Sequence, residues 1–259
     1  MQRLLTFFLS LWTWFELFAT AALLFPVSVV IWLFTLPFDR RLVLLHRFSS
    51  YWAILVCLLN PLWKIRVSGK EKIPRKTPFV MVSNHQSGAD ILVIYQLMTH
   101  FKWVSKKSLF WAPFVGWCMA MNRYIPLQRG KKSSINQMVE RCKETIRKGS
   151  PVMIFPEGTR SKDGSIQPFK TGAFRIALET KVPVVPIVIY GTNKAIKKGG
   201  FLIHRNHDMR VIVMDPLPYS LFAGDDNKKL ASRVREVISD GLSSCTENPV
   251  PPALSPLSE

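Results

Sequence analysis

The feature that most constrains this chain is a long, almost uncharged apolar run near its start. Leu4 to Leu36 covers 33 residues and contains one charged side chain, Glu16. A continuous helix of that length would measure about 50 Å, which exceeds the ~30 Å hydrocarbon core of a bilayer. Pro26 is expected to divide the run, and Leu4–Phe25 alone is long enough to span. The run predicts a membrane-associated segment and is too long for the apolar part of a signal peptide.

Two membrane arrangements fit the residues that follow. A second apolar stretch, Tyr51–Trp63, is too short to span by itself. The first run could therefore be a single spanning helix, or the two stretches could form a helical pair embedded in one leaflet. Basic residues at Arg40, Arg41 and Arg47 flank the first run. In either arrangement they predict a membrane protein with the rest of the chain on the cytoplasmic face.

Charge and hydrophobicity are separated along the sequence. The formal net charge is +18, although 48% of the residues are hydrophobic. Residues 1–36 carry only Arg3 and Glu16, so the whole excess lies on residues 37–259. Such a chain suits anionic membrane phospholipid, where each Lys or Arg near the surface contributes about 1 kcal/mol. Nucleic acid is the competing partner, but no nucleic-acid-binding motif is recognisable, so none is predicted. No cysteine or histidine cluster has metal-ligand spacing, so no metal is predicted either.

From about Trp63 onward, short apolar strands alternate with helices. This alternation predicts an α/β fold with a mostly parallel central sheet flanked by helices. Catalytic sites in such sheets lie at the carboxyl ends of strands. The expected strands are Phe79–Ser83, Lys102–Ser105, Tyr124–Leu127, Val152–Phe155, Val184–Tyr190 and Arg210–Met214. The expected helices are Asp90–Thr99, Leu109–Met121, Ser133–Lys148, Thr171–Thr180 and Lys228–Leu242.

The segment Asn84-His85-Gln86-Ser87-Gly88-Ala89-Asp90 follows the first of these strands directly. A reaction in which a hydroxyl attacks as a nucleophile needs a base to remove its proton, and histidine has a suitable pKa. A carboxylate on the other ring nitrogen fixes the tautomer and stabilises the imidazolium. Five residues across a turn can bring Asp90 back to His85, with Gly88 allowing the turn. The alternative is that Asp90 only caps a helix and His85 is a polar loop residue.

A second polar segment, Phe155-Pro156-Glu157-Gly158-Thr159-Arg160-Ser161, also follows a predicted strand. Glu157, Gly158, Thr159 and Arg160 combine an acceptor, an open backbone and a guanidinium fork that suits a phosphate. The alternative is a surface turn with a solvated arginine. Lys106 and Arg129 lie just past two further strand ends, which makes them candidates for the same cleft. Lys131 and Lys132 are expected to belong to a solvated face.

Together these residues resemble the glycerolipid acyltransferase family. Asn84–Asp90, followed 72 residues after His85 by Glu157 of Phe-Pro-Glu-Gly-Thr-Arg, is similar to the bacterial-type 1-acylglycerol-3-phosphate acyltransferases. The resemblance covers residues 60–215 and implies His85 as base and Asp90 as its orienting partner. It implies that Glu157, Gly158 and Arg160 help to hold lysophosphatidic acid, and that Lys106 and Arg129 add positive charge.

The resemblance also implies a donor and a domain organisation. The donor is acyl-CoA or acyl-carrier protein, with no bound cofactor and no metal. An N-terminal helical pair embedded in one leaflet is expected over residues 1–62, an α/β acyltransferase domain over 63–245 and a disordered tail over 246–259. One departure concerns Gln128, which occupies a place where the family usually has Asp before Arg129. The expected acceptor is the free sn-2 hydroxyl of 1-acylglycerol 3-phosphate, and the alternatives are glycerol 3-phosphate and another lysophospholipid.

The expected reaction follows from these assignments. A substrate hydroxyl attacks the thioester directly, since the sequence contains no G-x-S-x-G nucleophile motif. Backbone donors near Gly158 are expected to stabilise the oxyanion. The product is phosphatidic acid for phospholipid synthesis. The rival from a different class is a non-catalytic lipid-binding protein held at the membrane by the apolar segment and the basic face.

Overall fold

The computed structural model describes residues 2–161, 164–197, 199–204 and 206–247. Within them lies a seven-stranded sheet with the order β1-β7-β6-β2-β5-β3-β4. The strands are β1 (Trp63–Ser68), β2 (Val80–Ser83), β3 (Lys102–Lys106), β4 (Ile125–Leu127), β5 (Val152–Ile154), β6 (Val184–Tyr190) and β7 (Asn206–Val213). β6 and β7 pair antiparallel, whereas every other neighbouring pair is parallel. The predicted α/β fold with a mostly parallel sheet is confirmed.

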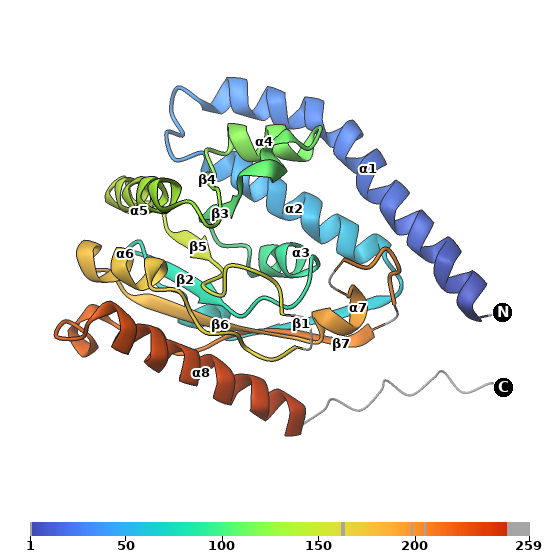
Figure 1. Ribbon diagram of the computed structural model, residues 1–259. Coiled ribbons are helices and arrows are strands. Elements are labelled where there is room, and N and C mark those ends of the chain that lie inside the picture. Colours follow the sequence, from blue (N-terminus) through green and yellow to red (C-terminus); the bar gives the residue numbers. More distant parts are fainter. Residues whose placement is uncertain (1, 162–163, 198, 205, 248–259) are drawn as a thin grey trace.

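Helices cover both faces of this sheet (Figure 1). The helices are α1 (Gln2–Thr35), α2 (Val43–Leu59), α3 (Asp90–Ile94), α4 (Val115–Met121), α5 (Lys132–Arg147), α6 (Gly172–Thr180), α7 (Thr192–Ala195) and α8 (Asn227–Glu247). α5, α6 and α8 pack on one face, and α2 and α3 pack on the other. α1 lies outside α2, and Figure 1 shows it running obliquely along that side of the molecule.

Alternation within the central strands explains why both faces are covered. Val80 and Val82 of β2 point into the core beneath α5, α6 and α8. Phe79 and Met81 point into the opposite core, beneath α2 and α3. All four side chains are at most 1% exposed. A strand buried on both faces is a continuous apolar run, which is how this segment reads in the sequence.

α1 continues through Pro26, so the prediction that this proline divides the apolar run is wrong. Proline removes one backbone donor and disfavours a helix interior. The helix is supported around this point by tertiary contacts, because the ring of Phe25 lies 5.7 Å from that of Phe114 and 5.3 Å from that of Trp117. Those contacts favour a continuous helix over a break at Pro26.

Several predicted boundaries also differ from the structure. The helix expected over Asp90–Thr99 ends at Ile94 and continues as the 3₁₀ turn Tyr95–Leu97, because Met98 adopts a left-handed conformation. The helix expected over Leu109–Met121 is a 3₁₀ turn, Lys107–Trp111, followed by α4. β1 and α7 were not predicted. α8 extends to Glu247, two residues into the predicted tail, and residues 248–259 lie outside the described residues. Two shorter 3₁₀ turns, Lys70–Lys72 and Tyr219–Leu221, complete the elements.

Candidate active site

Asn84 fixes the loop that follows β2 to the neighbouring strand β6. Its Nδ2 donates to the Ile189 carbonyl at 2.8 Å, and the Ile189 N–H donates to Asn84 Oδ1 at 2.8 Å. These two hydrogen bonds replace a backbone–backbone pair between β2 and β6, and they fix the point at which the chain leaves the sheet. Farther along, Ser87 Oγ donates to the Ile196 carbonyl at 2.8 Å. Both anchors lie in the segment that sequence reasoning singled out, but their partners are too distant in the chain to be predicted.

His85 and Asp90 are in direct contact within this loop. His85 Nδ1 lies 2.7 Å from Asp90 Oδ2, and the Asp90 side chain is fully buried. The same oxygen accepts the N–H groups of Gln86 at 2.7 Å and Ser87 at 2.9 Å. Asp90 therefore fixes the backbone of the loop that precedes α3 and also contacts His85. The predicted His85–Asp90 contact is present. The alternative in which Asp90 only caps a helix is wrong, because Asp90 is the first residue of α3 and its carboxylate accepts N–H groups that come before the helix. A carboxylate at Nδ1 favours the tautomer in which Nε2 has the free lone pair.

Phe155 limits how the His85 ring can rotate. The two rings are stacked, with centroids 4.0 Å apart and planes 12° apart. Trp103 lies behind Phe155 at 5.6 Å. Stacking and the Asp90 contact together fix both the plane and the orientation of the imidazole. Sequence reasoning missed this role for Phe155, whose only signal was its position at the end of the strand before Glu157.

Glu157 joins the two predicted segments from inside the protein. Its Oε1 accepts the His85 N–H at 2.6 Å, and its Oε2 accepts the Gln167 N–H at 3.0 Å. Glu157 is 3% exposed, and burial raises its pKa to about 7 although both hydrogen bonds act in the opposite direction. The Ser161 N–H also donates to the His85 carbonyl at 2.8 Å. Glu157 thus orients the backbone of the histidine loop, which differs from the expected contact with substrate.

Gly158 lies in a tight turn after Glu157. Its N–H donates to the Phe155 carbonyl at 3.1 Å. A backbone oxyanion donor near Gly158 stays a prediction. The φ of 71° at Gly158 lies in the left-handed region, and an added Cβ would approach Lys170 Nζ to 2.7 Å. Glycine is therefore required by the turn, which leads the chain from Glu157 to Arg160. Thr159, between them, is exposed.

Arg160 reaches over the histidine loop. One of its guanidinium nitrogens lies 3.6 Å from the position that a Cβ on Gly88 would take. Burial of the Arg129 guanidinium lowers its pKa, and the nearby charge of Arg160 lowers it further. The structure thus brings Arg160 close to the His85–Asp90 loop, with Arg129 near Arg160.

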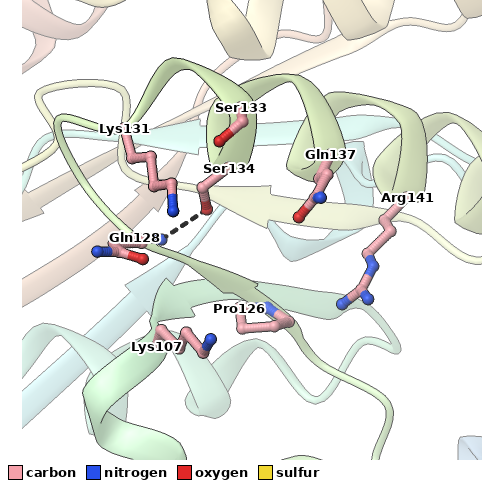
Figure 2. A pocket seen from close by; sticks show the side chains of 8 residues that line it. All are labelled: Lys107, Pro126, Gln128, Lys131, Ser133, Ser134, Gln137 and Arg141. Atoms are coloured by element: carbon pink, nitrogen blue, oxygen red, sulfur yellow. Dashed lines mark hydrogen bonds between the residues drawn. The ribbon is translucent and has the colours of Figure 1, made fainter.

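Lys106 is exposed at the carboxyl end of β3, opposite Leu127 of β4. The next lysine along the chain lines a polar hollow of about 250 Å³ that Figure 2 shows from close by, with Lys107 and Lys131 on facing sides. Gln128 also lines it, and its N–H donates to Ser134 Oγ at 2.9 Å. Lys131 is exposed, as predicted, but it belongs to this concave surface.

A large apolar cavity lies beside the His85–Asp90 loop. Its volume is about 460 Å³, and its lining includes Gly88, Arg160, Asn122 and Tyr124. α1 and α2 form part of its wall through Thr13, Trp14, Leu17, Ser49, Trp52, Ala53 and Val56. Sequence reasoning did not find this cavity, because its walls come from segments that are far apart in the chain.

Comparisons with known proteins agree with these features. The profile of the acyltransferase family matches residues 64–190. The chain is 43% identical over 186 residues to the chloroplast 1-acyl-sn-glycerol-3-phosphate acyltransferase BAT2 of Brassica napus, covering 71% of this chain and 54% of that protein. It is 34% identical over 176 residues to the human 1-acyl-sn-glycerol-3-phosphate acyltransferase alpha, covering 66% and 61%. The crystal structure of the 1-acyl-sn-glycerophosphate acyltransferase PlsC from Thermotoga maritima superposes with a TM-score of 0.77, at 25% identity, over 96% of this chain and 99% of that one.

This chain belongs to the glycerolipid acyltransferase family. The range matched by the family profile, 64–190, contains both the His85–Asp90 loop and the Glu157–Arg160 segment. α1 and α2 lie outside that range, but the superposition with the bacterial structure covers almost the whole chain. The chain spans a little over half the length of the first curated plant relatives that it matches.

Proposed function

We propose that this protein moves a fatty acyl chain from a thioester donor to the sn-2 hydroxyl of 1-acylglycerol 3-phosphate, forming phosphatidic acid. The observation that carries the proposal is the His85–Asp90 contact of 2.7 Å in the loop that borders the apolar cavity, beside the Arg160 guanidinium. Base, phosphate-binding cation and apolar chain site are the three elements that this reaction needs together. The names of the relatives support the same acceptor.

In the proposed mechanism His85 Nε2 takes the proton of the acceptor hydroxyl as its oxygen attacks the thioester carbonyl. The carbon–oxygen bond forms, and the carbonyl electrons move to the oxyanion of a tetrahedral intermediate. Asp90 stabilises the imidazolium that has formed. The intermediate collapses with cleavage of the carbon–sulfur bond, and the imidazolium returns the proton to the departing thiolate. The products are the new ester and a free thiol, whether the donor is acyl-CoA or acyl-carrier protein.

Arg160 is proposed to hold the acceptor phosphate, with Arg129 and Lys106 adding positive charge. Arg160→Ala should raise the acceptor KM by roughly 10- to 100-fold, the equivalent of one or two charge-assisted hydrogen bonds. kcat should change much less if the phosphate is held equally in the ground and transition states. Steady-state kinetics with 1-acylglycerol 3-phosphate as the varied substrate measures both constants. Arg233→Ala, on α8, is the matched control, and equal KM values for the two variants would remove Arg160 from the site.

The apolar cavity is proposed to hold an acyl chain. Ala53 lines it from α2 and is 3% exposed, so Ala53→Phe should fill part of the cavity. We expect kcat/KM for long-chain donors to fall about tenfold or more relative to short-chain donors, because part of the apolar contact of the longer chain is lost. A donor series of increasing chain length measures the shift. Ala223→Phe, at an exposed position, is the control, and an unchanged chain-length profile would exclude this assignment.

The helical pair is proposed to be embedded in one leaflet, with residues 63–245 as a catalytic domain on the cytoplasmic face. Among the described residues one helix, Thr6–Thr35, is long and apolar enough to cross a membrane, with a mean hydropathy of 2.3 in its best window. It is attached to the body along its length. Ser10 accepts the Ile203 N–H at 2.8 Å, Thr20 accepts the Trp52 indole N–H at 3.1 Å, and Phe25 packs on Trp117. Attachment at these points favours a helix lying beside the domain over one leaving it to cross the bilayer.

An acceptor panel tests the proposed function. Purified protein in mixed micelles is given one acyl-CoA with 1-acylglycerol 3-phosphate, glycerol 3-phosphate or 1-acylglycerophosphocholine in turn, and thiol release is followed. Release that depends on 1-acylglycerol 3-phosphate is the expected result. Release with another acceptor alone would move the protein to a different acyltransferase of this family. Lipid binding without acceptor-dependent thiol release would support the alternative that the protein is a non-catalytic lipid-binding protein.

A further inference from the structure

Six cationic side chains surround a second hollow, which we call the amino-edge pocket. Its volume is about 320 Å³, and its lining includes Arg40, Arg41, Lys102, Arg123, Arg141 and Lys148. Glu144 is the single carboxylate in the lining, and it pairs with Lys148 at 2.5 Å. Asp39, which lies nearby, accepts the Leu44 N–H at the start of α2 at 2.7 Å. The pocket therefore has a large excess of positive charge.

This pocket is distinct from the candidate active site. Lys102 and Ile125, which line it, are the first residues of β3 and β4, and Ser150 lies two residues before β5. His85 follows the carboxyl end of β2, which belongs to the same parallel set. Parallel strands have their amino ends at one edge of the sheet and their carboxyl ends at the other. A strand of five residues separates the two edges by roughly 15 Å.

Lys102 is the buried element of the pocket. The residue is 4% exposed, and its ammonium donates to the Asn122 carbonyl at 2.8 Å. No carboxylate of the described residues lies within ion-pair distance of it, and burial lowers its pKa to about 7. A buried ammonium without a counterion is costly. An anion in the pocket would offset that cost and stabilise the charged form.

The arginines of the pocket are held in place before any ligand arrives. Arg41 donates to the Gly149 carbonyl at 2.9 Å, and Arg123 donates to the Arg40 carbonyl at 3.3 Å. The backbone of Arg123 has a φ of 54°, a left-handed conformation that non-glycine residues rarely adopt. An arginine fixed at such a position contributes a guanidinium whose geometry suits a tetrahedral oxyanion.

We propose that the amino-edge pocket binds a phosphate monoester dianion. The loop between α1 and α2 contributes Arg40 and Arg41, and in Figure 1 this loop lies beside the apolar helices, where the headgroup of an anionic lipid would be within reach. A soluble phosphate offers the same chemistry. The Lys102–Asn122 contact connects the pocket to the apolar cavity, which Asn122 also lines. The proposal does not depend on the proposed acyl transfer.

The test is a binding titration of the full chain in detergent micelles. All proteins carry Arg160→Ala, so that phosphate binding at the candidate active site is weakened. The probes are inorganic phosphate, dihexanoyl phosphatidic acid and dihexanoyl phosphatidylcholine. Arg40→Gln/Arg123→Gln removes two exposed cations of the pocket, and Lys102→Met removes the buried one. Lys181→Gln/Lys228→Gln removes the same charge from exposed positions elsewhere and is the control.

We expect the affinity for phosphatidic acid to fall about tenfold or more in both pocket variants, the equivalent of losing one charge-assisted hydrogen bond. The control pair should change it by less than about twofold, as screened surface charges do. Tighter binding of phosphatidic acid than of inorganic phosphate identifies the lipid headgroup as the source, and the reverse order identifies a soluble phosphate. Equal effects of the pocket and control pairs, or equal binding of phosphatidylcholine and phosphatidic acid, would overturn the proposal.

Discussion

Replacing His85 by alanine should lower kcat by at least about 10³-fold while leaving the protein folded and membrane-bound. A positioned general base contributes roughly 10²- to 10⁴-fold. His85, the proposed base, has the plane of its ring fixed by Phe155 and its tautomer fixed by Asp90. Acceptor-dependent thiol release measures the loss, and circular dichroism checks the fold. His204→Ala, at a partly exposed histidine, is the control and should retain activity.

Asp90→Asn separates the charge of the dyad from its geometry. The amide oxygen of asparagine can accept the same three N–H donors that Asp90 Oδ2 now accepts. Its nitrogen would take the place of Oδ1, which has no hydrogen-bond partner among the described residues. The loop should persist, but the imidazolium loses its counter-charge, so kcat should fall about 10²- to 10⁴-fold. Near-normal kcat in either dyad variant would refute the proposed mechanism.

Glu157→Gln should lower kcat about 10²-fold, the scale of an error of roughly 1 Å in the position of the base. Glutamine can accept only one of the two N–H groups that Glu157 binds, and its own N–H₂ would face the other. The backbone that carries His85 should therefore shift. Thiol release measures the effect. Glu236→Gln, an exposed carboxylate on α8, is the control, and equal kcat values would show that Glu157 does not position His85.

The same variant carries a pH signature. The pKa of Glu157 is raised to about 7, so the folded chain holds this proton more tightly than the unfolded chain does. This group therefore makes the free energy of unfolding decrease as pH rises from about 4.5 to about 7. Thermal unfolding across that range should show a shallower decrease in Glu157→Gln than in the wild type. Parallel curves for the two proteins would contradict the raised pKa.

The dyad was predictable because its chemistry is local. His85 and Asp90 are five residues apart, follow an apolar strand and need one turn to meet. Arg160 was predictable as a neighbour because its segment follows a strand of the same parallel sheet. The residues that support the site could not be predicted, since their partners are distant in the sequence. Asn84 bonds Ile189, 105 residues later, and Phe155 stacks on the ring of His85, 70 residues earlier. Glu157 was found in the sequence, but its task inside the protein depends on which way its carboxylate points.

For the fold, the buried strands were predictable and the polar or interrupted elements were not. β6 reads as an apolar run and has the predicted bounds, Val184–Tyr190. β1 lies at the edge of the sheet, where alternating Lys64 and Arg66 hide its strand character. The break before α4 depends on Phe114, whose φ of 59° no sequence pattern indicates. The continuity of α1 through Pro26 rests on contacts with α4 that lie about 90 residues away.

α1 forms part of the wall of the apolar cavity, so the predicted membrane segment and the proposed site share one structural unit. Thr13, Trp14 and Leu17 line the same space as Gly88 and Arg160. A fragment beginning at residue 63 would lack the residues of α1 and α2 that line the cavity, so the cavity would be open to solvent on that side. The boundary predicted between residues 62 and 63 therefore does not separate two independent parts of the protein, because residues on both sides of it line the same cavity. A redesign of this protein should therefore keep α1, or change α1 together with the residues of the site.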